Sequence, residues 1–508
     1  MSGAMEERPL VRNAGPGIAY EEPLVFELSR PGRTGASLPE LDVPAVDPAG
    51  VLPAGALRDD CPGLPELSEV EVVRHFTRLS TWNAAVDLGL YPLGSCTMKY
   101  NPKLNEKVAR LPGFAGAHPL QPVELAQGIL ELCWRLERAL AEITGMDRVS
   151  LQPAAGAQGE LAGVMMIRAY HRSRGEDRRK LLIPDTAHGT NPASAALNGF
   201  EVVAVPSGPD GVLHPEAVAP LMGPDVAGLM LTNPNTLGLF EDHIVRICEI
   251  VHASGGLVYG DGANLNALLG IARPGDLGLD VMHLNLHKTF STPHGGGGPG
   301  SGPVAVKNVL APHLPVPVVR KREANEGGGF DLDYEFPHSI GRLHGNLGNA
   351  GMWVRAWTYL RSLGPDGLRR CAEMAVLNAN YLKARLEGAF HVPYDRPVMH
   401  ECVFSDKLLA DTGVTTLDVA KRLIDHGYHP PTVYFPLVVH GALMIEPTES
   451  ESLEGLDRFA ETLLAIVREA RADPETVKNA PHRTRLTRLD ETRAARRPVL
   501  RWQPPSGS

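Results

Sequence analysis

The chain has 508 residues, which is too many for one compact core, and two or three domains are expected. Its hydrophobic content of 43% and charged content of 21% are ordinary for a globular protein, and its net charge of −10 argues against a general nucleic-acid binder. The six cysteines form no Cys-x-x-Cys pair, so zinc ribbons and secreted disulfide scaffolds are not expected. There is neither a signal-peptide pattern nor an apolar run long enough to span a bilayer, which predicts a soluble, cytoplasmic protein without membrane contact.

The first part of the chain is rich in Pro and Gly and shows little periodicity, which predicts an extended N-terminal arm over residues 1–70. Such an arm is either disordered or wraps a neighbour. The apolar residues at 24–26 and 28 need cover, which favours wrapping. Further along, Pro122 is expected to open a helix that stops at Gly145. Its apolar face is predicted to hold Leu125, Ile129, Leu132, Leu136, Leu140 and Ile143.

Short apolar runs then alternate with helical patterns, which predicts an α/β domain with a mostly parallel sheet over residues 71–357. In such a sheet, ligands bind outside the carboxyl ends of the strands. The expected strands are 149–151, 180–183, 201–205, 228–231, 256–259, 281–286 and 303–306, and the expected helices include 160–170 and 243–253.

A smaller α+β domain is predicted over residues 358–478, followed by a basic tail at 479–508. The tail either lies on the surface of the protein or contacts an acidic partner. The expected elements here are helices at 352–363, 368–386, 417–426 and 453–471 and strands at 400–404 and 442–445.

Four of the predicted strand ends carry polar or small residues that suit chemistry. The first is the segment 152–160, which leads straight into a helix and can bind a phosphate through free backbone N–H groups. The second is His188, which can stack on a flat ring or move a proton, although a lone loop histidine is more often merely hydrogen-bonded. The third is Asp261, whose carboxylate can pair with a pyridinium nitrogen, although taken alone it fits a strand-end turn.

The fourth strand end is Lys288, a lysine directly after a strand-like run and before a glycine-rich segment at 295–298. A deprotonated lysine can form a Schiff base with a carbonyl, and lysine shifts its pKa readily when buried. The alternative interpretation is a surface lysine before a flexible loop. This alternative is less favoured, because the segment 152–160, His188 and Asp261 precede Lys288 in the order expected of a pyridoxal-phosphate site.

Two further patterns do not support a site. The glycines at 295, 297 and 300 fit a Gly-x-Gly-x-x-Gly spacing, but a strand-like run follows them, whereas a dinucleotide fingerprint must open a helix. His283 and His287 share one strand face but lack a partnering cluster of His or Cys, so no metal is expected.

Phosphate loop, histidine, aspartate and lysine, in this order, indicate a fold-type I pyridoxal-phosphate enzyme. Several segments resemble the P-protein of the glycine cleavage system, glycine dehydrogenase (decarboxylating), and in particular its subunit 2. The similarity runs from about residue 23 to 502. The segments that carry it are 91–102, 185–195, 232–238, 284–298, 434–437 and 444–449.

This resemblance implies a role for each matching residue. Lys288 would hold pyridoxal 5'-phosphate covalently and act in catalysis with His188, which would stack on the cofactor ring. Asp261 would pair with the ring nitrogen. The remaining cofactor contacts implied are Ala263 on the opposite ring face, Ala155, Gly156 and Ala157 at the phosphate, Thr190 and His287 nearby, and Asn235 at the phenolic oxygen.

The resemblance also implies the reaction and the partners. Glycine would lose CO2, and its aminomethyl group would pass to the lipoyl disulfide of H-protein, which performs the oxidation. Because the one-chain form of the enzyme is about twice as long, a separate subunit 1 and an α2β2 assembly are implied. The alternatives are another fold-type I activity, such as an amino-acid decarboxylase or lyase, and a non-catalytic scaffold subunit.

Two segments remain open within the resemblance. Residues 95–97 are expected to face the mouth of the site, where Cys96 is either a redox-sensitive thiol or a packing residue. Residues 341–349 depart from the family pattern, which usually has aromatic residues there, and this puts the contacts near Arg342 in doubt.

Overall fold

The computed structural model describes residues 22–58, 63–294, 298–484 and 486–503. Contacts divide the chain into two units, residues 1–85 and residues 86–508. Within the described residues, no helix is both long and apolar enough to cross a membrane. Of the glycine-rich segment at 295–298 that follows Lys288 in the sequence, residues 295–297 lie outside the described residues.

The described residues of the first unit form three helices joined by irregular chain. They are α1 (Val25–Leu28), α2 (Pro48–Val51) and α3 (Glu69–Ser80). A reciprocal capping box between Ser68 and Glu71 begins α3. The helix then leaves Val70, Val73 and Phe76 more than half exposed.

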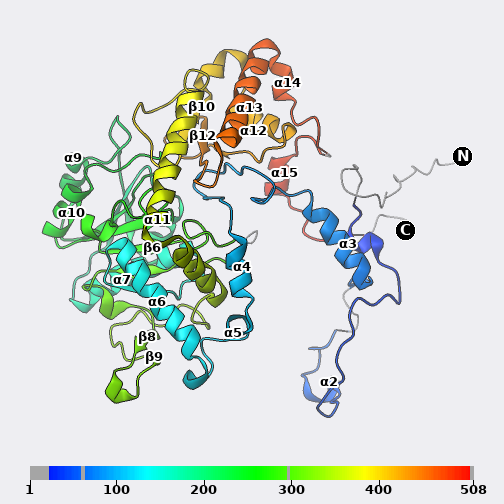
Figure 1. The fold of residues 1–508 in the computed structure, drawn as a ribbon, viewed down its shortest axis with the longest axis vertical. Coiled ribbons are helices and arrows are strands. Elements are labelled where there is room, and N and C mark those ends of the chain that lie inside the picture. The colour runs from blue at the N-terminus through cyan, green and yellow to red at the C-terminus, as the bar shows by residue number, and fades with distance from the viewer. Residues whose placement is uncertain (1–21, 59–62, 295–297, 485, 504–508) are drawn as a thin grey trace, which may run out of the picture. The chain divides into compact units, whose positions relative to one another are not determined.

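The second unit, in which Figure 1 labels strand β6, is built around a seven-stranded sheet. The order of its strands is β1-β7-β6-β5-β4-β2-β3. The strands from β3 to β6 run parallel, and β7 is antiparallel to both β6 and β1. All seven expected strands are present, which confirms the predicted α/β architecture. Their bounds are β1 Arg148–Ser150, β2 Lys180–Pro184, β3 Glu201–Val205, β4 Val226–Thr232, β5 Leu257–Gly262, β6 Val281–Leu284 and β7 Val304–Val306.

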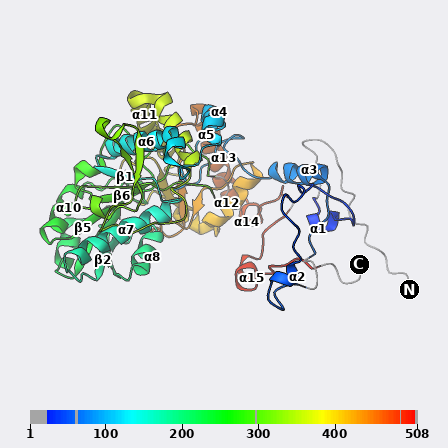
Figure 2. The same cartoon turned by 90° about the horizontal axis from the view of Figure 1, so that it is seen from below.

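Helices cover both faces of this sheet. Figure 2 shows α6 (Gln127–Thr144) and α11 (Ala350–Leu386) on one face and α7 (Gly156–Ser173) and α8 (Thr190–Leu197) on the other. Successive residues of a strand therefore enter different cores, as Leu229 and Met230 of β4 do. The other helices and strands before α11 are α4 Lys103–Ala109, α5 Pro112–Ala115, α9 Pro215–Val218, α10 Ile244–Ala253 and a hairpin of β8 Val318–Lys321 and β9 Phe330–Asp333.

The start of α6 corrects one prediction. A 3₁₀ turn at Val123–Leu125 precedes the helix, and Leu125 is 71% exposed instead of lying on the apolar face. Ala126 has non-helical dihedrals between the turn and the helix, so the two do not share one periodicity. The predicted stop at Gly145 is confirmed, because this glycine caps α6 with φ of +69°.

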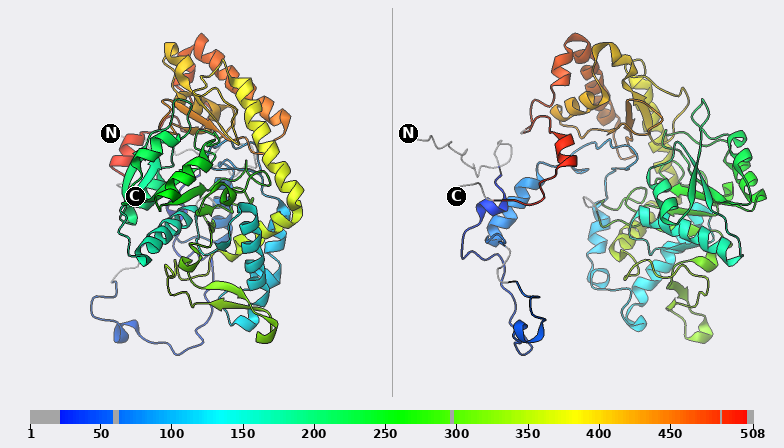
Figure 3. Two further views of the ribbon diagram at one scale, coloured as in Figure 1. Left: turned by 90° about the vertical axis from the view of Figure 1, so that its left-hand side faces the viewer. Right: turned by 180° about the vertical axis from the view of Figure 1, so that it is seen from behind.

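The helix α11 leads from the large sheet to a small α+β domain (Figures 1 and 3). Gly364, with φ of +64°, interrupts it and separates the two helices expected at 352–363 and 368–386. A three-stranded antiparallel sheet of order β10-β12-β11 forms the small domain with several helices. Their bounds are β10 Cys402–Ser405, α12 Thr416–Asp425, β11 Thr432–Val433, β12 Ala442–Ile445, α13 Leu453–Ala472 and α14 Pro474–Lys478.

The basic tail contains a short helix, α15 (Glu491–Arg496), and contacts α12. Arg488 donates a hydrogen bond to Asp418 Oδ1 at 2.6 Å and another to the carbonyl of Ala480 at 2.9 Å. These contacts favour the interpretation of a tail that lies on the protein surface.

Candidate active site

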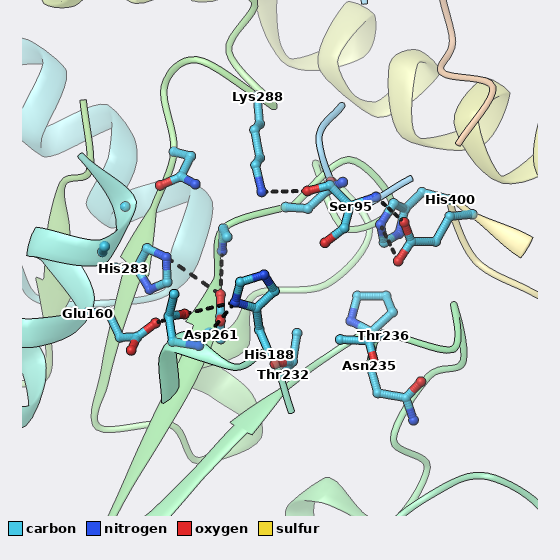
Figure 4. A pocket seen from close by; sticks show the side chains of 18 residues that line it. Ser95, Glu160, His188, Thr232, Asn235, Thr236, Asp261, His283, Lys288 and His400 are labelled. Atoms are coloured by element: carbon cyan, nitrogen blue, oxygen red, sulfur yellow. Dashed lines mark hydrogen bonds and ion pairs between the residues drawn. The ribbon is translucent and has the colours of Figure 1, made fainter. Parts of the chain in front are cut away.

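The candidate site is a pocket at the carboxyl ends of the parallel strands, where a ligand of an α/β sheet is expected (Figure 4). Loops after β2, β4, β5 and β6 contribute to it, together with the start of α7 and one loop from before α4. The side chains that line it are Ser95, Gly156, Ala157, Glu160, His188, Thr190, Thr232, Pro234, Asn235, Thr236, Asp261, Ala263, Asn264, His283, Asn285, Lys288, His400 and Glu401.

Lys288 follows β6 and is half-buried at the top of the pocket in the view of Figure 4. Its ammonium donates a hydrogen bond to the carbonyl oxygen of Ser95 at 2.6 Å. Ser95 and Thr97 have φ of 65° and 51°, a left-handed backbone that is uncommon for residues other than glycine. This loop therefore holds a strained conformation that turns a carbonyl toward the lysine.

Two buried carboxylates of the small domain hold the Ser95 loop in this conformation. Glu401 Oε2 accepts the N–H of Ser95 at 2.8 Å, and Glu446 accepts both the N–H and the hydroxyl of Thr97, at 2.9 and 2.8 Å. Burial raises the pKa of Glu401 to about 8 and also raises the pKa of Glu446. The two carboxyl groups and His400 bring ligand atoms within 4.8 Å of one another, a spacing that a metal ion could use.

Asp261 ends β5 and is only 6% exposed. Burial alone would raise the pKa of its carboxyl group, yet the electrostatic interaction with His283 and the hydrogen bonds that the carboxylate accepts hold the pKa below its ordinary value. These bonds come from the N–H of Ala263 at 3.0 Å and the amide of Asn191 at 3.2 Å, and His283 Nε2 lies 3.5 Å away. Asp261 therefore remains ionised and can hold a protonated ring nitrogen.

His188 lies in the loop after β2 and is open to the pocket. Its Nδ1 is 2.9 Å from the hydroxyl of Thr190, which donates to Glu160 Oε2 at 2.8 Å. Partial burial lowers the pKa of His188, so its imidazole is neutral near pH 7. A neutral flat ring in this place can stack on an aromatic ligand.

The start of α7 forms the opposite wall. Ala155 begins the helix without a side-chain cap, and Gly156 and Ala157 line the pocket. A Cβ atom on Gly156 would come within 3.0 Å of the side-chain amide of Asn285, so the backbone passes there because glycine has no side chain. An uncapped helix start with a bare backbone suits a phosphate group.

Three residues that were predicted to contact the cofactor are arranged differently in the structure. Ala155 and His287 do not line it, and the ring of His287 instead accepts the N–H of Ser301 at 3.3 Å. Asn235 lines the pocket but uses its side chain within its own loop. The amide of Asn235 donates to Gly211 and Glu241, and its oxygen accepts the N–H groups of Leu237 and Leu239. The prediction that Asn235 reaches the cofactor's phenolic oxygen is therefore not supported, because both polar atoms are already bonded.

Sequence reasoning missed several residues that line the pocket. Glu160 lies inside the predicted phosphate segment, and its position after a strand was the available signal. The spacing of His283 suggests only metal ligation, whereas this residue contacts Asp261 and the hydroxyl of Tyr259. Two of them, His400 and Glu401, come from the small domain, and nothing in the adjoining sequence places them in this pocket. Glu446 lies beside them without lining the pocket.

The residues present fit pyridoxal phosphate. The pocket supplies an ionised carboxylate for the ring nitrogen, a bare helix start for the phosphate and a lysine for the aldehyde. Its lining also contains buried polar atoms without a hydrogen-bond partner in the described residues, namely Thr232 Oγ1, Asn285 Oδ1 and Glu160 Oε1. Such atoms are expected where a polar ligand belongs.

The fold and the pocket define a class of enzyme, the fold-type I pyridoxal-phosphate enzymes. The chain is similar to a solved structure of glycine decarboxylase (P-protein) of the glycine cleavage system in inhibitor-bound form. The TM-score is 0.70 at 22% identity, covering 81% of this chain and 92% of the other. It is also similar to glutamate decarboxylase of Lactobacillus brevis, with a TM-score of 0.62 at 15% identity and coverage of 84% and 97%. At these identities the likeness shows the shared fold.

Sequence comparison shows the family. The model described as "Glycine cleavage system P-protein" matches residues 48–427, and the model "Glycine dehydrogenase, C-terminal domain" matches residues 371–485. The chain is 58% identical to the probable glycine dehydrogenase (decarboxylating) subunit 2 of Halalkalibacterium halodurans, covering 95% of this chain and 98% of the relative. It is 57% identical to the protein of the same name in Caldanaerobacter subterraneus, covering 94% and 98%. The chain belongs to the glycine cleavage system P-protein family.

Proposed function

We propose that the chain is the lysine-bearing subunit of a glycine-cleaving P-protein. It decarboxylates glycine with pyridoxal phosphate held on Lys288 and transfers the aminomethyl group to the lipoyl disulfide of H-protein. The observation that carries this proposal is the position of Lys288 and Asp261 in one pocket, at the ends of neighbouring strands, in a chain of this family.

Each of these pocket residues has its own proposed role. When bound, pyridoxal phosphate supplies an electron sink for the pair left by departing CO2. Asp261 keeps the ring nitrogen protonated, and His188 stacks on the ring opposite Ala263. The start of α7 binds the phosphate, and Thr190 lies nearby in the lining of the pocket. Lys288 would hold the cofactor's aldehyde group, and the carbonyl of Ser95 accepts a hydrogen bond from the lysine nitrogen when the lysine is free.

The partners follow from the family. The relatives are named as subunit 2, which implies a partner subunit 1, and an α2β2 assembly is part of the proposal. The N-terminal arm is proposed to wrap a neighbouring subunit. Exposed apolar residues of the arm support this, since Leu24, Leu38 and Leu41 would otherwise face water.

Exchange of labelled bicarbonate into the carboxyl group of glycine tests this function. The purified chain is assayed with and without a subunit 1 and lipoylated H-protein, and Lys288→Ala serves as the matched variant. We expect exchange only when all three components are present. The variant should lose both the exchange and the long-wavelength absorbance of the lysine-bound cofactor.

The outcomes separate the alternatives. Release of CO2 from another amino acid without H-protein would replace the proposal with a different decarboxylase. An unchanged cofactor absorbance in Lys288→Ala would show that this lysine does not hold the cofactor.

A further inference from the structure

A chain of hydrogen bonds runs from Glu160 at the back of the pocket to the ring of His188. Glu160 Oε2 accepts the hydroxyl of Thr190 at 2.8 Å and the amide of Asn191 at 3.0 Å. The same hydroxyl oxygen lies 2.9 Å from His188 Nδ1. Glu160 is 1% exposed, and its second oxygen, Oε1, has no hydrogen-bond partner in the described residues.

The hydroxyl of Thr190 has one proton and two neighbours, and this restricts the possible arrangements. If Glu160 is ionised, it can only accept, so the Thr190 proton points to Glu160 and His188 must donate from Nδ1. If Glu160 is protonated, it can donate to the Thr190 oxygen, and the hydroxyl then donates to an unprotonated Nδ1. The backbone N–H of Thr190, 3.3 Å from Nδ1, assists only the second arrangement.

We propose that Glu160, acting through the hydroxyl of Thr190, determines which ring nitrogen of His188 carries the proton. Glu160 is thus a positioning residue. The tautomer assignment rests on the hydrogen bonds alone, and its consequence for catalysis rests on the proposed function.

The surroundings of Glu160 allow both of its protonation states near neutral pH. Burial raises the pKa of Glu160 to about 7, and the charge of Asp261 adds to the effect, against the hydrogen bonds that the carboxylate accepts. The pKa of His188 is lowered, so its imidazole stays neutral. Protonation or ionisation of Glu160 therefore moves the single ring proton of His188 from one nitrogen to the other. The titratable groups nearest to Glu160 are Asp261 and Tyr259 on β5, His283 on β6 and His188 itself.

The tautomer decides what His188 offers to a substrate. Its Nε2 makes no hydrogen bond within the described residues, and the ring lines the pocket (Figure 4). With Glu160 ionised, Nε2 has a free electron pair and takes a proton from the ammonium of an incoming amino acid. The electron pair of the broken N–H bond stays on the amine, which becomes a nucleophile, and the imidazolium formed is stabilised by Glu160. With Glu160 protonated, Nε2 carries a hydrogen and cannot accept.

Nitrogen-15 NMR of histidine-labelled full-length chain tests the proposal, both without and with pyridoxal phosphate. The His188 signals are assigned by their loss in His188→Asn. In the wild-type chain we expect the proton to move from Nε2 at pH 6 to Nδ1 at pH 8. In Glu160→Gln, the amide oxygen should take the place of Oε2, because the Thr190 and Asn191 donors both point there. This variant should therefore show the Nδ1–H form at both pH values.

Two Thr190 variants provide the matched pair. Thr190→Ser keeps the hydroxyl and should keep the pH-dependent change, whereas Thr190→Val should show the Nε2–H form throughout. A His188 tautomer that does not change between pH 6 and pH 8 in the wild-type chain would overturn the proposal, and this measurement needs no variant to fold. So would a Glu160→Gln chain that still changes tautomer.

The catalytic consequence has its own readout. The rate at which glycine displaces the lysine, followed by absorbance, should rise about tenfold per pH unit below the pKa of Glu160 in wild-type protein and stay flat in Glu160→Gln. A tautomer change without glycine turnover would leave the inference standing and contradict only the proposed function.

Discussion

Lys288 and Asp261 meet because their strands are neighbours in a parallel sheet. The register pairs Asp261 of β5 with His283 of β6, five residues before the lysine. A polar residue directly after a buried apolar strand is visible in a sequence, and the carboxyl ends of parallel strands lie at one edge. For this reason the lysine, the aspartate and His188 could be predicted from the amino-acid sequence alone.

Other residues in the pocket and beside it could not be predicted, because long-range register places them. Glu401 and Glu446 stand next to each other because β10 and β12 are antiparallel, with Cys402 opposite Ile445. They reach Ser95 and Thr97 across more than 300 positions of sequence. Asn235 shows the converse, since the family resemblance implied a ligand contact, while its own loop uses both polar atoms of its side chain.

Asp261→Asn tests the role of the ionised carboxylate. Asparagine keeps the shape but loses the charge that stabilises a protonated ring nitrogen, so we expect the bicarbonate exchange rate to fall by about 100-fold or more. The cofactor should still attach to Lys288, as its absorbance would show. Asp261→Glu keeps the charge and is expected to retain more activity. Equal rates in Asp261→Asn and wild-type protein would contradict the assignment.

At the level of elements, periodicity predicted the existence of helices and strands better than their ends. The strand at 442–445 and the helix at 453–471 agree with the structure to within one residue. The start of α6 does not, because a 3₁₀ turn imitates the first helical turn in its apolar spacing and exposes Leu125. Local backbone geometry of this kind leaves no clear pattern in a sequence.

Gly156→Ala tests the start of α7 as a phosphate site. The added methyl group would press on the amide of Asn285 and push the backbone away from the ligand, so we expect weaker binding of pyridoxal phosphate. Cofactor affinity is measured by titrating cofactor-free protein and following absorbance. Gly128→Ala in α6, where no atom lies within 4 Å of the new methyl group, is the control. It should leave cofactor binding unchanged and raise helix stability by about 0.5–1 kcal/mol.

At the level of the whole second unit, two hydrophobic cores are joined by α11. Its first part contributes Trp353 and Leu360 to the core of the large domain, and its last part contributes Leu382 and Leu386 to the core of the small one. Gly364 lies between these parts. The alternation of strands and helices predicted the α/β architecture, whereas the sharing of one long helix between both cores was not evident from sequence.

Buried acids make the stability of this fold dependent on pH. Burial raises the pKa of Glu137 on α6 to about 8, above the ordinary 4.5. Between these values the folded chain keeps a proton that the unfolded chain releases, so the free energy of unfolding falls as pH rises. Glu137→Gln removes this loss and should stabilise the cofactor-free protein at pH 8 while changing little at pH 4.5.

Urea unfolding at the two pH values measures this effect. Glu131→Gln, on the exposed side of α6, is the matched control, because its surface ion pair with Arg135 contributes little to stability. A Glu137→Gln chain that gains the same stability at both pH values would show that Glu137 is already neutral or ionised throughout.

The pairing of β1 with β7 has a consequence for how the protein is made. The first strand of the seven-stranded sheet along the chain pairs with the last strand of that sheet, with Ser150 opposite Val304. About 150 residues must therefore be synthesised after β1 before this pair can form. The same closure brings the N–H of Gly302 to the carbonyl of Pro153, beside the phosphate loop. A nascent chain that ends before Val304 already contains Asp261 and Lys288 but lacks this contact to the phosphate loop. We therefore expect the complete cofactor site to form only after residue 304 has been synthesised.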